Sequence, residues 1–406
     1  MSLQTIPMLL ALVGVALYAV LGGADFGAGF WQLVAGPGER GARIREHAHE
    51  GMAAVWEANH VWLIFVLVML WTCYPPAFAS IVSTLAVPLF IAAVGIVLRG
   101  TAYALRAGTT RARELRSVDT VFGVASILTP FALGTVAGAI AAGRVPVGNA
   151  AGSTWSSWIS AVPLTIGALA VVVGAYLAAV YLAADAVRRG ASDLERAFRT
   201  RALGAGVVAG VAAAGGLIVL HADAHGLYHA LVGDGLPALI VSGLAGLGTL
   251  ALVFMRRYEV ARYSAALAVA AVVAGWALAQ QPELLPGLTV SAAAAPHDTL
   301  VAVLIAFCAG TVFLGPALWL LFSLSLRGAL AYGGQGEGAG VSAPVQALSG
   351  SRNALLARVA LACLVLTLGF LTAADAPWAH AIGVAALFAG IAAGFRAAVM
   401  PAEPAP

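Results

Sequence analysis

Long apolar runs are the feature that most constrains this chain. Crossing ~30 Å of hydrocarbon takes about 20 apolar residues, and eleven segments reach roughly that length. The chain is 61% hydrophobic and only 10% charged, too few charges for a soluble surface of this size. The bilayer must therefore be its solvent, and we predict an all-α integral membrane protein, a polytopic helical bundle. The predicted spans are residues 5–33, 53–73, 77–105, 118–142, 158–186, 202–220, 237–255, 263–280, 298–326, 355–371 and 378–395.

The distribution of arginine predicts the orientation of this bundle. All 21 basic residues are Arg, and Arg accumulates in cytoplasmic loops. Nineteen of them fall on one side of the predicted spans, whereas the other side has only Arg144 and Arg99 lies inside a helix. We therefore expect the N-terminus outside and the C-terminus in the cytoplasm. Because these Arg residues are scattered through short loops, they form no nucleic-acid-binding face.

Composition divides the chain into three parts. Residues 328–354 are rich in Gly, Ala and Ser, a composition typical of flexible linkers. This linker separates a nine-helix core, residues 1–327, from an additional hairpin, residues 355–396. No basic segment precedes the first apolar run, so we expect a retained helix and a mature chain that begins near its first Met. The second run is expected to end before Pro75, which lacks an amide donor.

Three ionisable residues inside the spans are the candidate functional residues. They are Asp25 in GGADFGAGFW, Glu57 in AVWEANHVWLI and Arg99 in VLRGTAYALR, and each costs ~2.5–3.5 kcal/mol at a helix centre. In the predicted orientation all three lie roughly 6–12 Å inside the cytoplasmic boundary, so we expect them to converge. Arg99 would neutralise one carboxylate and leave the other to carry protons. The alternative is that Asp25 and Arg99 form a buried ion pair that only fixes helix packing.

The polar neighbours of Glu57 favour a proton path over simple packing. Glu57 is preceded by Trp56 and followed by Asn59 and His60, at positions where helix packing would favour aliphatic side chains. His60 comes three residues after Glu57, on roughly the same helical face. Two roles stay open for His60, because it could extend the path or simply hydrogen-bond Glu57.

Glycines surround Asp25 with four-residue spacings. Such spacings allow two helices to approach closely, and packing is the favoured explanation. A phosphate-binding loop is excluded because no strand precedes the motif and no Lys follows it. The glycines are Gly22, Gly23, Gly27 and Gly29.

The sequence predicts no metal site. Three cysteines, Cys73, Cys308 and Cys363, lie in separate apolar stretches, which argues against a disulfide framework or a zinc site. A group of outer-loop residues has a spacing that could hold a divalent cation on a helical turn. A solvated helix end is favoured there, since the loop lacks the supporting carboxylates that usually orient metal ligands. The group comprises His221, Asp223, His225 and His229.

Haem ligation within this chain is also not expected. An embedded haem needs an axial His, Met or Cys that faces the bundle interior, and only His60 lies clearly within a span. His47 and His49 are placed in a cytoplasmic loop. Any redox cofactors should therefore belong to a partner chain. The remaining histidines, at outer ends, are His221, His225, His229, His297 and His380.

Four stretches resemble the N-terminal signature of cytochrome bd quinol oxidase subunit II, over roughly the first 110 residues. They are ALYAVLGGADFGAGFW, VWEANHVWLIFVLVMLW, YPPAFA and STLAVPLFIAAVGIVLRGTAYALR. The resemblance implies a heterodimer with subunit I in a prokaryotic plasma membrane, which oxidises quinol, reduces dioxygen to water and takes protons from the cytoplasm. It implies two haems b, one haem d and the quinol site in subunit I, with a structural quinone left open for this chain.

The resemblance also assigns roles to residues. It implies that Glu57 is the acid of the family's Trp–acid motif, which lines a proton path toward subunit I. Asp25 and Arg99 match family positions as well. The hairpin at residues 355–396 departs from the family pattern, because many members end after nine helices.

Two other functions compete with this assignment. A proton-coupled secondary transporter would also place paired charges inside a bundle, but it usually repeats the site in both halves of the chain. The later spans contain almost no ionisable residue. An inert scaffold for a membrane complex is the third candidate, and it is excluded only if Glu57 affects turnover.

Overall fold

The computed structural model describes most of the first 326 residues. Its internal contacts divide the chain into two units, Met1–Ala317 and Leu318–Pro406. The predicted linker lies outside the described residues, and so does the predicted hairpin except at scattered helical positions. Side chains are not described at 52–53, 56–58, 107–108, 112 and 313–326. Described residues are 2–53, 56–108, 111–326, 359, 362–363, 382, 384–390, 392–393 and 396.

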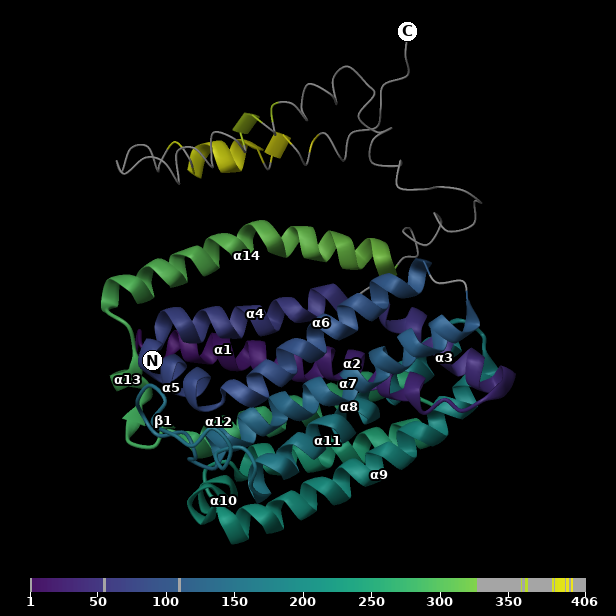
Figure 1. Ribbon diagram of the computed structural model, residues 1–406, viewed down its shortest axis with the longest axis horizontal. Helices are drawn as coiled ribbons and strands as arrows, with labels where there is room; N and C mark the ends of the chain where they lie inside the picture. The colour runs from purple at the N-terminus through teal and green to yellow at the C-terminus, as the bar shows by residue number, and fades with distance from the viewer. Residues whose placement is uncertain are drawn as a thin grey trace. The chain divides into compact units, whose positions relative to one another are not determined.

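The described part of the chain is helical apart from one small hairpin (Figure 1). That hairpin pairs β1 with β2 in antiparallel register, Leu285 opposite Leu288. The elements are α1 (Ile6–Leu17), η1 (Tyr18–Gly22), α2 (Gly23–Leu33), α3 (Gly38–Ala53), α4 (Trp56–Cys73), α5 (Pro75–Thr84), α6 (Ala86–Gly108), α7 (Ala112–Ala141), α8 (Ala161–Arg188), α9 (Ser192–Asp223), α10 (His225–Val232), α11 (Leu236–Phe254), α12 (Tyr258–Gln280), β1 (Glu283–Leu285), β2 (Leu288–Thr289), α13 (Val290–Ala293) and α14 (His297–Leu326).

Helix length and composition support the predicted membrane bundle. Seven helical stretches in the described part are long and apolar enough to cross a bilayer. Two shorter apolar helices, Asn59–Cys73 and His297–Val312, fall within the second and ninth predicted spans. The all-α membrane architecture is thus confirmed, whereas the inside–outside orientation stays a prediction. The seven are Ile6–Leu33, Ala86–Arg106, Arg113–Ala141, Ala161–Arg188, Ser192–Asp223, Leu236–Phe254 and Tyr258–Gln280.

The third predicted span begins later than the sequence suggested. A helix does start at Pro75, as the Pro pair predicts, but it breaks at Leu85, and the spanning helix α6 starts one residue later. The Ser80 hydroxyl donates to the Pro76 carbonyl and accepts a hydrogen bond from the Gly148 amide. The Ser80 side chain therefore joins α5 to the loop after α7.

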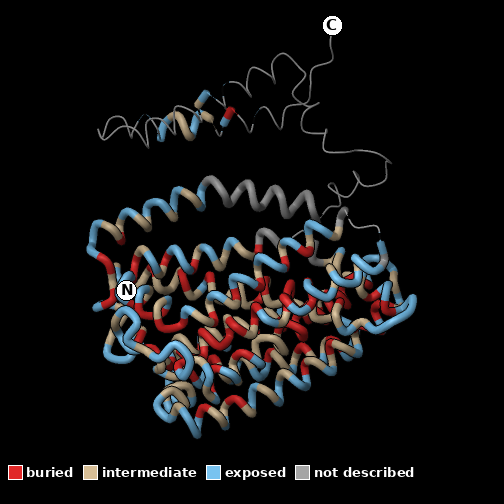
Figure 2. The backbone as a smooth tube through the Cα atoms, in the orientation of Figure 1, coloured by how far each residue is buried: buried red, intermediate tan, exposed pale blue. Residues whose placement is uncertain are grey.

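Helix α8 forms the centre of the first unit. It contacts α2, α7, α9 and α12, and buried residues run along it (Figure 2). A Cβ on Gly27 of α2 would lie 1.9 Å from the Gly174 carbonyl oxygen of α8. The Trp31 indole donates to the Ala175 carbonyl at 2.8 Å. This close crossing confirms that glycines of the Asp25 motif serve packing.

Outward faces of the spanning helices are apolar. Val211 and Ile218 of α9 are 68% and 71% exposed, and Leu247 of α11 is 67% exposed. Figure 2 shows such exposed positions along the outside of the helices. In a soluble protein a patch of this kind would mark an interface, and on spanning helices it is the surface that lipid covers.

The first span contains a π-helical turn that the sequence did not predict. This turn, η1, lies between α1 and α2 and ends just before the Asp25 motif. A π turn adds a residue to one helical turn, so it changes which face the following residues present. It therefore sets the direction in which α2 points its carboxylate.

Candidate functional site

Asp25 of α2 and Arg99 of α6 form a buried, two-pronged ion pair. The Arg99 Nη1 and Nη2 atoms lie 2.5 and 2.7 Å from the two carboxylate oxygens. Nη2 also donates to the Asp25 carbonyl at 3.1 Å, and Nε donates to the Ser126 hydroxyl of α7 at 3.0 Å. The exposed fraction is 0% for Asp25 and 2% for Arg99. Three helices are thus joined at one point by charge-assisted hydrogen bonds.

Aromatic rings close this ion pair off from solvent. The Arg99 guanidinium carbon lies 4.9 Å from the ring centre of Phe26 and 4.6 Å from that of Phe122. Both contacts are cation–π interactions, which strengthen where water is excluded. The arginine is therefore fully engaged by hydrogen bonds and rings, and this favours the ion-pair interpretation of Asp25 that the sequence left open.

A second layer of charges lies two helical turns away along α6 and α7, with α3 in place of α2. Arg106 of α6 is 2.8 Å from Glu46 of α3 and 3.2 Å from Asp119 of α7. Arg106 follows Arg99 by seven residues on α6, and Asp119 precedes Ser126 by seven residues on α7. Seven helical residues rise about 10 Å. The antiparallel α6–α7 pair thus carries two stacked polar layers.

His49 of α3 lies between the two layers. Its ring centre is 5.3 Å from that of Tyr103 on α6 and 6.5 Å from that of Phe122 on α7. Burial lowers the pKa of His49, and the positive charge of Arg106 lowers it further, against the opposing effect of Asp119. His49 is therefore a neutral imidazole near neutral pH, able to accept a proton between two charged layers.

The sequence placed His47 and His49 in the connection between the first two spans, and the structure shows that this connection contains a helix. Both lie on helix α3, and His47 is buried with its Nε2 3.0 Å from the Leu182 carbonyl oxygen. The helix was missed because charged residues fill it and no apolar run marks it. A periodic signal does exist, since Ile44 and Ala48 are buried one turn apart on the same face.

Helix α4 brings two predicted site residues to the level of Asp25. Asn59 is buried and its amide donates to the Leu21 carbonyl at 3.2 Å. The His60 ring centre is 6.0 Å from that of Tyr18 and 5.9 Å from that of Phe26. Phe26 also contacts Arg99, so one ring joins His60 to the buried pair.

Glu57 and Trp56 occupy the first turn of α4, and their side chains lie outside the described part of the structure. The predicted convergence of Glu57 with Asp25 and Arg99 therefore stays a prediction, as does the role of His60 beside it. The convergence of Asp25 with Arg99 is observed.

Glu195 is a second buried carboxylate among the described residues, and it was not predicted. It lies in the first turn of α9 and accepts a hydrogen bond from the Tyr258 hydroxyl of α12. Arg256 lies 3.9 Å away. Glu195 lies between the fifth and sixth predicted spans, 158–186 and 202–220, so the search for ionisable residues inside the spans did not include it. Its two partners make it a link between helix ends rather than a second transport site.

The outer-loop histidines are arranged as neighbours on a helix end. His221 and His225 have ring centres 4.9 Å apart, and Asp223 is paired with Arg144 at 3.1 Å. Within the described residues no group of three or more metal-ligating side chains occurs. Asp223 thus already has a cationic partner.

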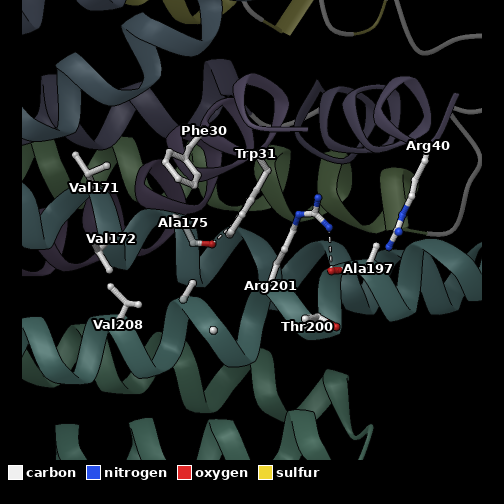
Figure 3. Close-up of a pocket in the computed structure, with 12 residues that line it drawn as sticks. Phe30, Trp31, Arg40, Val171, Val172, Ala175, Ala197, Thr200, Arg201 and Val208 are labelled. Atoms are coloured by element: carbon white, nitrogen blue, oxygen red, sulfur yellow. Dashed lines mark hydrogen bonds between the residues drawn. The ribbon is translucent and has the colours of Figure 1, made fainter. Parts of the chain in front are cut away.

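Two described histidines, His47 and His60, have surroundings that do not fit the axial ligation of a haem. His47 is bonded to a carbonyl, and its ring centre lies 5.4 Å from that of Phe198. The His60 ring is enclosed by Tyr18 and Phe26. A groove of about 610 Å³ between α2, α8 and α9 (Figure 3) is lined by no His, Met or Cys, the usual axial ligands.

Comparison with known proteins gives one consistent result. The sequence model of the family "Cytochrome bd terminal oxidase subunit II" matches residues 3–325 of this chain. A curated relative, cytochrome bd ubiquinol oxidase subunit 2 of Bacillus subtilis (strain 168), is 27% identical over 116 residues, which are 29% of this chain and 33% of the relative. That match spans about a third of the relative's length. A chain in the structure of bd oxidase from Geobacillus thermodenitrificans superposes with a TM-score of 0.63 and 24% identity, covering 80% of this chain and 99% of that chain.

Proposed function

The chain belongs to the cytochrome bd terminal oxidase subunit II family, and from this premise we propose that it is the haem-free subunit of a quinol oxidase. The complex oxidises quinol and reduces dioxygen to water in the plasma membrane of a prokaryote. This chain supports a haem-bearing subunit I and lines a proton uptake path from the cytoplasm. The observation that carries the proposal is the family match over residues 3–325, which includes the whole layered site.

The stacked charge layers support a role in proton uptake. Reduction of dioxygen to water consumes protons, and a buried oxidase core needs a route that delivers them. Glu46, Arg106 and Asp119 form the layer near the α6–α7 turn, and Asp25 with Arg99 forms the deeper one. Ionisable groups inside a membrane bundle are costly and usually functional. We interpret these ionisable residues at two successive depths as parts of one proton path.

We assign different tasks to the residues of this path. Glu57 and His60, three residues apart on α4, pass protons toward subunit I. Asp25 belongs to the same path, and its bonds to Arg99 fix the relative positions of α2 and α6 beside that path. Asn59 and Trp56 position the first turns of α4.

The cofactors are proposed to lie in the partner. Haems b and d supply the electron transfer and oxygen chemistry when bound in subunit I, and the surroundings of His47 and His60 in this chain do not fit the axial ligation of a haem. The contribution of this subunit is to hold α2, α4, α6 and α7 together and to move protons along them.

Replacing Glu57 with Gln tests the proposed path. Glutamine keeps the size and hydrogen bonding of the side chain but cannot take up and release a proton. We expect oxygen consumption by the purified complex to fall by about tenfold or more, since positioned proton transfer contributes 10²–10⁴-fold in enzymes. Visible difference spectra should show unchanged haem content.

A control for this substitution is Glu114→Gln. Glu114 is exposed, and among the described residues its ion pair is with the exposed Arg111, a contact of little energetic value. Its oxygen consumption should equal that of the unmodified complex. Full turnover in Glu57→Gln with normal haem spectra would remove Glu57 from the path and leave the chain as a scaffold.

A further inference from the structure

A groove between α2, α8 and α9 has the size of a ligand site (Figure 3). Its volume is about 610 Å³, and ligand pockets commonly hold about 300–1,000 Å³. Trp31 of α2 and Ala175 of α8 form its floor, and their hydrogen bond joins the two helices. None of the residues in the charge layers lines this groove.

The two ends of the groove differ in chemistry. Arg40, Thr200 and Arg201 lie toward one end, and Val171, Val172 and Val208 lie toward the other, as Figure 3 shows. A wall of branched aliphatic side chains favours hydrocarbon, whereas two guanidinium groups favour an anion. The groove therefore suits an amphipathic molecule with a negatively charged head.

The cationic end lies at the membrane boundary. Arg201 is the last charged residue on α9 before the uncharged run from Ala202 to Leu220. Trp31 is two residues from the end of α2, and indole rings favour the bilayer interface. The arginine-rich side of the predicted topology is the same side. A head bound here lies at headgroup level, and its tail follows the valines into the hydrocarbon.

Neither cation of the groove has an acidic partner among the described side chains. Arg201 donates to the Ala197 carbonyl at 3.1 Å and lies 5.5 Å from the Trp31 ring centre. No carboxylate of the described part lies within ion-pair distance of Arg40 or Arg201. Two like charges beside one groove repel each other, and an anion between them would offset that repulsion.

We propose that this groove binds one acidic phospholipid of the surrounding leaflet. Its phosphate lies between Arg40 and Arg201, and an acyl chain follows Val172 and Val208. A quinone is less suited because its head is neutral and gains little from two cations. A free inorganic anion would leave the apolar wall unused. This site is independent of the proposed proton path and does not require it.

Native mass spectrometry of the complex, purified through a tag on this chain and stripped of lipid, tests the proposal. Phosphatidylglycerol is titrated back, with phosphatidylcholine, inorganic phosphate and a quinone as separate probes. We expect phosphatidylglycerol to be retained preferentially. The double variant Arg40→Gln/Arg201→Gln should bind it about tenfold or more weakly, because each basic residue at a lipid surface adds to anionic lipid binding.

Two further variants sharpen the result. Arg196→Gln removes a cation from the same helix outside the groove, and it should bind phosphatidylglycerol normally. Arg40→Lys/Arg201→Lys keeps the charge and should retain most of the binding. Equal retention of phosphatidylcholine, competition by inorganic phosphate at the same concentration, or retention of a quinone in place of lipid would each overturn the proposal. These three results come from the unmodified complex, so they decide even if the Gln variant does not assemble.

Discussion

Replacing Arg99 with Met is expected to destabilise the subunit by about 3–5 kcal/mol, the usual cost of removing one partner of a buried ion pair. The Asp25 carboxylate would stay at 0% exposure without its cation, and the Ser126 hydroxyl would lose its donor. Thermal unfolding of the complex in nanodiscs, followed by light scattering and haem absorbance, measures the loss. The yield of assembled complex should fall with it.

A double variant separates the packing role of this pair from a role in proton uptake. Asp25→Leu/Arg99→Met replaces both charges with apolar side chains, a change that is often neutral or stabilising. We expect it to recover most of the lost stability. Recovery of oxygen consumption as well would assign the pair to packing, whereas stable complexes with slow turnover would assign it to the proton path.

The exposed pair of Arg43 with Asp193 provides the control. Its two side chains are 58% and 43% exposed, and such pairs contribute only about 0–1 kcal/mol. Arg43→Met should therefore leave unfolding almost unchanged. An Arg99→Met complex as stable as this control would contradict the account of a buried, fully bonded arginine.

The sequence predicted the bundle, and it predicted that Arg99 neutralises a buried carboxylate, because both follow from local costs. A spanning helix needs about 20 apolar residues wherever it lies, so the length of the apolar runs predicted the spans. A charge inside such a run must find a partner, but the sequence left open whether Arg99 pairs with Asp25 or with Glu57. Neither inference requires knowledge of how the helices are arranged around each other.

The second charge layer could not be predicted in the same way, because it depends on register. Arg106 meets Asp119 only because α6 and α7 pair antiparallel with Arg99 opposite Ser126. Hydropathy does not fix such a register. The position of His49 was not predicted for a related reason, since α3 is a charged helix that packs mainly against α2, α8 and α9.

Local hydrogen bonding explains the remaining differences from the predicted spans. Hydropathy runs through α5, but Pro88 has no amide hydrogen to donate to the Thr84 carbonyl four residues earlier, and the helix breaks at Leu85. The π turn before α2 has no clear composition signal. Both features change which face of a helix points toward its neighbours. Neither changes the hydropathy averaged over a window of residues, so hydropathy does not predict them.

Replacing Gly27 with Ala is the second substitution with a large expected effect. The added Cβ would lie 1.9 Å from the Gly174 carbonyl oxygen and 2.8 Å from the Ala175 amide nitrogen. Because both neighbours are backbone atoms of α8, they cannot rotate away as a side chain could. The two helices must separate, which should cost about 1–3 kcal/mol or more, as for other overpacked sites. Thermal unfolding of the complex measures this loss.

The matched control is Gly210→Ala on α9. No heavy atom lies within 4 Å of a Cβ added there, so the change should be neutral or stabilising by up to about 1 kcal/mol, because Ala is the better helix former. Gly27→Ala should also lower oxygen consumption, since Asp25 lies two residues away on the displaced helix and its bonds to Arg99 must lengthen. A Gly27→Ala complex as stable and active as Gly210→Ala would show that the α2–α8 crossing does not position the buried pair.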